Sequence, residues 1–264
     1  MNPQRILVST ALLALSGTAL ADVTVTTQTT GKMFIDISGE GVNSIKGKRQ
    51  RSDTTLRGKM QTLIIDIDGR RFVDLDAKKK VANVTSLDSI ADELQKIGTG
   101  TIEAQLTKTD QTKQVAGYPC TVHDISVSLP FSPTGHAGDG MDLTMTLSGT
   151  VCLATNVPGL ADYQAFSRAA ADSGFIFGDP RVAKSPTGAA QAKAYAALTR
   201  KMADAGMALE SNVNINAGGD GPMAGMMARL AKGNIVTTVT KIETGALPAE
   251  SFEIPADYKT KTRD

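Results

Sequence analysis

Two stretches of alternating apolar and polar residues, one on each side of a single loop, constrain the fold of this chain most strongly. From 121 to 129 the odd-numbered residues are mainly apolar and the even-numbered ones mainly polar, and the same alternation recurs from 143 to 151. A repeat of two residues is typical of a β-strand with one face in the core. The segment 132–140 is rich in Gly, Ser, Pro and Asp, which predicts a loop. We therefore expect an antiparallel hairpin.

Folding this hairpin about His136 predicts its register. The apolar residues then oppose one another in three pairs: Ile125 with Leu147, Val127 with Met145, and Leu129 with Leu143. The same register sets Cys120 opposite Cys152, and the chain has 2 cysteines in all. Directly opposed residues have Cβ atoms about 4.5 to 5.5 Å apart, near enough for a disulfide after slight adjustment. We predict that bridge.

The N-terminus predicts a compartment in which a disulfide persists. Arg5 precedes an apolar run from Ile6 to Leu15, and the small residues Ala19 and Ala21 stand before Asp22. This is the layout of a secretory signal peptide. We expect residues 1–21 to be removed by a Sec-type pathway and residues 22–264 to form one soluble domain in the periplasm or outside the cell. No Cys follows the cleavage position, so no lipid anchor is expected there.

Charge and hydropathy exclude some classes of partner. No second apolar run is long enough to span a bilayer. Between Lys32 and Lys80 there are 12 basic and 7 acidic residues, an excess that could orient the protein on an anionic membrane or partner. The simpler interpretation is a solvated set of strand faces. Aromatic residues, which stack on nucleic-acid bases, are only 4% of the chain, so we expect no nucleic-acid partner.

The rest of the chain predicts a meander of strands followed by helices and two further strands. We expect strands at 23–38, 44–56, 60–67, 71–75, 81–84 and 101–107, with a tight turn at Asp68-Gly69. Apolar residues at helical spacing predict helices near 87–98, 159–173 and 189–205. Strands return at 208–215 and 234–242, separated by a short segment with Met223, Met226 and Met227.

Several motifs in this order resemble a known superfamily. They are Ile64-Ile65-Asp66, Phe72 to Asp76, Lys78 to Lys80, Val115 to Cys120, Val157 to Leu160, Leu247-Pro248 and Phe252 to Tyr258. The chain resembles an uncharacterised family of exported bacterial proteins, similar in turn to the half-barrel superfamily of LolA-like and LppX-like lipoprotein and lipid carriers. The resemblance implies an α+β fold: a strongly curved antiparallel sheet, or half-barrel, with helices covering its concave face and a cavity for acyl chains.

Catalytic signatures are scarce. His123 lies on the apolar face of the hairpin, where a structural histidine is expected, and His136 lies in the loop. Asp124 cannot pair with His123, because adjacent strand residues point to opposite faces. No GxSxG nucleophile elbow occurs. We therefore expect no enzyme and no cofactor.

Two groups of residues resemble metal ligands. Asp66, Asp68, Asp74 and Asp76 alternate along a predicted hairpin, which is more simply a solvated strand face than a calcium loop. Met223, Met226 and Met227 carry soft thioethers suited to Cu(I), but no His or Cys accompanies them. Core packing, or an adaptable lining for an apolar ligand, fits these methionines better.

Three functions therefore remain. The first is a non-enzymatic envelope protein that binds a lipid, an acyl chain or a protein partner. Its ligand would contact the apolar face of the hairpin and the methionine segment, through Ile125, Val127, Leu143, Met145, Leu147, Met223, Met226 and Met227. The second is a structural or interaction module whose helices fill the cavity, and the third is copper binding through the methionine segment.

Overall fold

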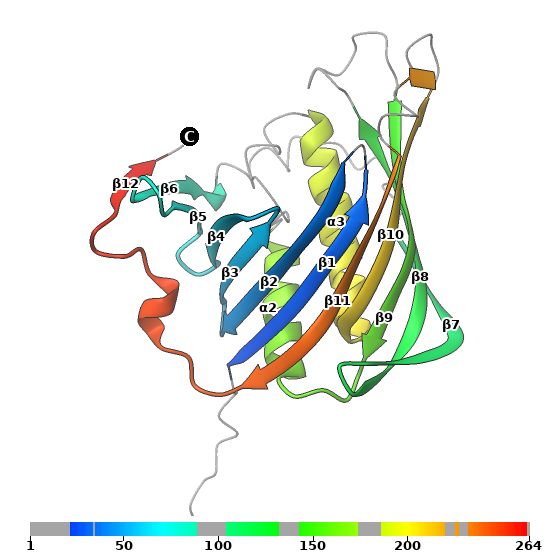
Figure 1. The fold of residues 1–264 in the computed structure, drawn as a ribbon, viewed down its shortest axis with the longest axis horizontal. Helices are drawn as coiled ribbons and strands as arrows, with labels where there is room; N and C mark the ends of the chain where they lie inside the picture. The colour runs from blue at the N-terminus through cyan, green and yellow to red at the C-terminus, as the bar shows by residue number, and fades with distance from the viewer. Residues whose placement is uncertain are drawn as a thin grey trace, which may run out of the picture.

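The computed structural model describes residues 22–33, 35–88, 104–131, 143–173, 186–219, 225–226 and 232–262. Within these ranges the chain forms one 12-stranded sheet with two α-helices on one side of it (Figure 1). All neighbouring strands are antiparallel except the pair at one edge, β12 and β6. This agrees with the expected α+β class. The predicted signal peptide, residues 1–21, lies outside the described residues.

The first half of the sheet is a meander in sequence order. Its strands are β1 (Val23–Lys32), β2 (Asp36–Lys46), β3 (Arg49–Leu56), β4 (Lys59–Asp66), β5 (Arg71–Asp76) and β6 (Val81–Ser86). The sequence predicted one strand from 23 to 38 where the structure has β1, a turn and the start of β2. That prediction was wrong because Met33 and Ile35, which lie between the two strands, are not among the residues that usually mark turns, namely Gly, Pro, Asn and Asp.

The second half contains the expected hairpin. Its strands are β7 (Ala104–Val115), β8 (Tyr118–Phe131), β9 (Leu143–Ala154), β10 (Met207–Gly219) and β11 (Gly233–Thr244). β11 pairs with β1, which joins the two halves in the middle of the sheet. The sheet order is therefore β12-β6-β5-β4-β3-β2-β1-β11-β10-β9-β8-β7, with β12 and β7 as edges.

Two helices pack against one face of the sheet, which we call the helix face. They are α2 (Leu160–Asp172) and α3 (Pro186–Ala205), close to the expected 159–173 and 189–205. α2 contacts β2 and β10, α3 contacts β7 to β10, and the two helices contact each other. The helix predicted at 87–98 lies outside the described residues after Asp88. No helix in the described part of the chain has the length and apolar character to cross a membrane.

The C-terminal segment covers part of the opposite face, which we call the outer face. It comprises the short 3-10 helix η2 (Ala249–Phe252) and β12 (Lys259–Thr262), neither of which the sequence predicted. Ile254 and Tyr258 pack on a cluster formed by Ile64, Val73, Leu75 and Ala82. Alternate residues of β4 and β5, such as Ile65 and Phe72, belong instead to the core under the helices. The sheet therefore buries apolar side chains on both faces at this end.

Candidate functional site

A partly enclosed cavity between α2 and the central strands is the best candidate for a ligand site. It has a volume of about 250 Å³, and its apolar and polar lining residues come from β1, β2, β3, β10, β11 and α2. The apolar ones are Val25, Ile45, Phe166, Ala208 and Val239, and the polar ones are Thr27, Asn43, Gln50, Tyr163 and Ser167. Ligand pockets typically combine apolar walls with a few polar groups and measure about 300 to 1,000 Å³, so this cavity lies just below that range.

Helical spacing explains why α2 forms one wall of this cavity. Tyr163, Phe166 and Ser167 are three and four residues apart, which sets them on one face of a helix. The helix starts at Gly159, whose φ of 70° is left-handed, and a Cβ there would come within 2.6 Å of the Val23 side chain. Only glycine allows α2 to begin this close to β1.

The polar groups of the cavity have partners within the protein. The Gln50 side-chain amide donates to Asn43 Oδ1 at 3.4 Å, and the Thr27 hydroxyl donates to the Gly41 carbonyl at 3.3 Å. Burial raises the pKa of Tyr163, and hydrogen bonds to Ala208 and Ser167 offset part of that rise. The phenol therefore stays neutral near pH 7. The lining residues of the cavity include no charged side chain.

The ligand residues expected in the hairpin lie elsewhere, under α3. Ile125, Val127 and Leu147 are buried in a cluster with Ala194 and Leu198 of α3, and Met145 packs against the same cluster. Leu143 begins β9, and its side chain lies outside what is described. Ile125, Val127, Met145 and Leu147 share a face as expected, but α3 occupies the space beside them.

Only one of the three methionines in the segment between β10 and β11 can be located. Met226 has a side chain that is 48% exposed, whereas Met223 and Met227 lie outside the described residues.

The cavity residues were not recognised from the sequence. The available signal was the spacing of Tyr163, Phe166 and Ser167 on the predicted helix.

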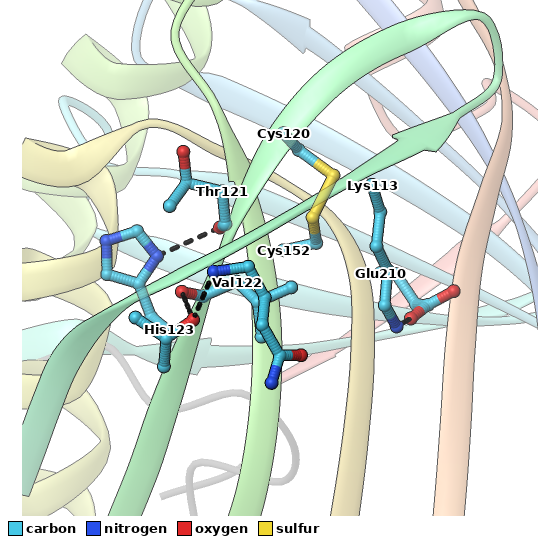
Figure 2. Close-up of a disulfide and its surroundings, with 9 residues drawn as sticks. Lys113, Cys120, Thr121, Val122, His123, Cys152 and Glu210 are labelled. Atoms are coloured by element: carbon cyan, nitrogen blue, oxygen red, sulfur yellow. Dashed lines mark hydrogen bonds and ion pairs between the residues drawn. A yellow bond between two sulfur atoms is a disulfide. The ribbon is translucent and has the colours of Figure 1, made fainter.

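The predicted disulfide is confirmed, with a different register. Cys120 and Cys152 are bonded, with their Cα atoms 5.4 Å apart (Figure 2). Cys152 lies opposite Val122 rather than Cys120, so the bridge is diagonal. The opposed apolar pairs are Val127 with Leu147 and Leu129 with Met145, a shift of two residues from the prediction. An even shift leaves every side chain on its own face, so alternation alone could not detect the error.

A buried histidine and an ion pair lie near the disulfide. His123 is buried on the helix face, with Nδ1 3.0 Å from the Thr121 carbonyl oxygen (Figure 2). Asp124 is exposed on the opposite face of the strand, as expected. On the side of the disulfide, Lys113 of β7 pairs with Glu210 of β10 at 2.6 Å. His136 lies outside the described residues.

The four aspartates of the β4–β5 hairpin do not form one solvated face. Asp66 is only 2% exposed, and it accepts hydrogen bonds from Arg71 at 3.1 Å and from the Gly69 amide at 2.8 Å. The solvated-face prediction was wrong for Asp66, because two arginines of neighbouring strands, Arg49 and Arg71, compensate its charge. Asp68 and Asp76 do pair with lysines at the surface. Within the described ranges, no group of three or more His, Cys, Asp or Glu residues could hold a metal ion.

Comparisons with known proteins give structural likeness at very low sequence identity. No family model and no curated protein matches the chain. An uncharacterised conserved protein from Thermus thermophilus aligns over 93% of this chain and 92% of its own, with 7% identity and a TM-score of 0.38. A LolA superfamily protein from Nitrosomonas europaea aligns over 89% of this chain and 91% of its own, with 8% identity and a TM-score of 0.28.

Proposed function

We propose that this protein binds an apolar ligand, such as one acyl chain, in the cavity between α2 and the central strands, without catalysing a reaction. In this proposal the sheet is a half-barrel whose concave face is the helix face. The observation that carries the proposal is the cavity itself. It combines the apolar walls of Val25, Phe166 and Val239 with uncharged polar groups.

The size of the cavity limits the ligand. Burial of each CH₂ group contributes about 0.8 kcal/mol, so about six methylenes contribute about 5 kcal/mol before the cost of association. A volume of about 250 Å³ favours a single short chain over a lipid with several. The hydrogen bond between Gln50 and Asn43 does not use Asn43 Nδ2 or Gln50 Oε1, so these two atoms offer hydrogen bonds to a polar end of such a chain.

The proposed location is the cell envelope, with a soluble mature protein. Two features support it: the signal-peptide pattern of residues 1–21, and the buried disulfide, which persists in oxidising compartments and is rare in the cytoplasm.

A second candidate is an interaction module whose helices fill the space on the helix face and that binds no small ligand. The observation in its favour is α3, whose Ala194 and Leu198 pack directly on Ile125 and Val127. This packing occupies the part of the helix face that the sequence assigned to a ligand.

Filling the cavity distinguishes these two functions. Ser167→Leu adds an apolar side chain inside the cavity, whereas Ala165→Leu adds the same side chain on the exposed face of the same helix. We expect the parent protein and the Ala165→Leu variant to bind a fluorescent fatty-acid probe and the Ser167→Leu variant to lose that binding. Native mass spectrometry of protein purified from its own envelope should also detect a co-purified lipid. Equal probe binding by both folded variants, or none by the parent, would favour the interaction module.

A further inference from the structure

Two hairpin turns project from the same end of the sheet. Because β1 and β3 run in the same direction, the β1–β2 turn and the β3–β4 turn lie at one end (Figure 1). The amide of Arg57 in the second turn donates to the carbonyl of Ser38 near the start of β2 at 3.1 Å. The turns are therefore neighbours. We call this region the hairpin end, formed by the described residues 32, 33, 35–38 and 55–60 together with the start of β11, whose Asn234 pairs with Lys32.

Exposed apolar side chains collect at the hairpin end. In the described part of the chain, the exposed large hydrophobic residues are Ile35 (37%), Leu56 (40%), Met60 (73%) and Met226 (48%). The first three belong to the two turns, and Met226 lies in the segment that joins β10 to β11 at the same end of the sheet. Elsewhere the described surface has no large apolar side chain this exposed. In the register of β3 and β4, Leu56 pairs with Lys59 and Met60 with Thr55, so Leu56 and Met60 lie on opposite faces of the sheet and make its tip apolar on both sides.

Cationic side chains flank these apolar ones. Lys32, Arg57, Lys59 and Lys232 are exposed there, and within the described residues no ion pair is formed by Arg57 or Lys59. Asp36 and Glu40 are the exposed carboxylates of the same strands, so cations outnumber anions. Apolar side chains surrounded by Lys and Arg match a membrane surface that carries anionic lipids.

The β3–β4 turn is tight and holds the side chains of Leu56 and Met60 on either side of it. Arg57 and Gly58 both have positive φ, 52° and 75°, the pattern of a tight two-residue turn between antiparallel strands. Leu56 lies over the backbone of Gly39 in the neighbouring strand. The turn therefore holds Leu56 and Met60 at the tip without a flexible loop, which lowers the entropy lost on docking.

We propose that the hairpin end docks the protein on anionic membrane surfaces, with Ile35, Leu56 and Met60 entering the interface and Lys32, Arg57 and Lys59 contacting lipid phosphates. This proposal goes beyond ligand binding in the cavity and does not depend on it. None of the residues that line the cavity under α2 belongs to the hairpin end. Loss of docking and loss of probe binding can therefore be measured separately.

Co-sedimentation of the mature chain with vesicles tests the proposal. We expect binding to vesicles of phosphatidylglycerol and phosphatidylcholine, and much weaker binding to phosphatidylcholine alone. Each cation near an anionic surface contributes about 1 kcal/mol, so Arg57→Gln/Lys59→Gln should weaken binding about thirtyfold. Met60→Ser changes a side chain that is 73% exposed, and it should weaken vesicle binding roughly tenfold.

The matched control removes the same charge from the other end. Lys48 and Lys241 are exposed at the opposite end of the sheet, so Lys48→Gln/Lys241→Gln lowers the net charge equally. This variant should bind within about twofold of the parent, allowing for long-range attraction. Equal weakening in both double variants would overturn the proposal in favour of a net-charge effect. The absence of parent binding to anionic vesicles would also overturn it, and would leave a protein partner as the occupant of the hairpin end.

Discussion

Removal of the Cys120–Cys152 disulfide should lower the free energy of unfolding by about 3 to 4 kcal/mol. The two cysteines are 32 residues apart in sequence, and the chain-entropy model gives about 3.7 kcal/mol at 25 °C for a loop of that length. Both residues are almost fully buried. Replacing both by alanine therefore introduces no buried polar group, and the lost cross-link dominates the effect.

Urea unfolding followed by circular dichroism measures this loss. With an m-value of about 2 to 3 kcal/mol/M, a loss of about 3.7 kcal/mol lowers the midpoint by roughly 1 to 2 M. The neighbouring ion pair supplies the control: Lys113→Ala removes the contact with Glu210, at a partly exposed position, and should cost under about 1 kcal/mol.

Thiol labelling gives an independent check. Alkylation of the folded protein without reductant should leave its intact mass unchanged, and reduction in denaturant should then allow two adducts. Two labelled thiols in oxidised protein, or a midpoint for the Cys120→Ala/Cys152→Ala variant equal to that of the parent, would refute this account of the cross-link.

N-terminal sequencing of the exported protein should begin at Asp22, and a retained leader would contradict the cleavage prediction. Asp66→Ala should lower the unfolding free energy by about 2 to 3 kcal/mol, because it removes charged hydrogen bonds from a buried site; Asp68→Ala, at an exposed ion pair, should cost under about 1 kcal/mol. Burial raises the pKa of Asp53, but hydrogen bonds from Arg51 and Thr62 prevail and hold it below its usual value. Its contribution to stability is therefore present above the ordinary pKa of about 4 and is lost as the pH falls through the lower folded-state value. Urea midpoints at pH 6 and pH 3 should thus differ less for Asp53→Asn than for the parent, and an equal difference would argue against this linkage.

The sequence predicted the elements that carry a strong local pattern. The alternation in β8 and β9, the helical spacing in α2 and α3, and the Asp68-Gly69 turn all correspond to observed elements. The disulfide was also predicted, although through a register displaced by two residues. Cysteines offset diagonally can still be bridged where their Cα atoms are 5.4 Å apart, so the correct bond did not require the correct register.

Features that depend on distant parts of the chain could not be predicted. Val25 of β1, Phe166 of α2 and Val239 of β11 line the same cavity. Local periodicity in the sequence does not indicate that these three distant residues lie side by side. Asp66 resembles its exposed neighbours in sequence, and only the arrangement of Arg49 and Arg71 across the sheet explains its burial. The position of the C-terminal segment over the outer face is likewise a tertiary effect.

The pairing of β1 with β11 determines the order in which the fold can be completed. Val23 of β1 pairs with Thr244 of β11. β1 can therefore complete its pairing only after nearly all of the described chain has been synthesised. Until β11 arrives, the meander from β1 to β6 has an unpaired edge at β1, with a row of open backbone donors and acceptors that invites pairing between molecules. Contacts of such long sequence separation also form slowly. The nascent protein therefore passes through a period of vulnerability to aggregation, and a chaperone that shields β1 during this interval would improve its folding yield.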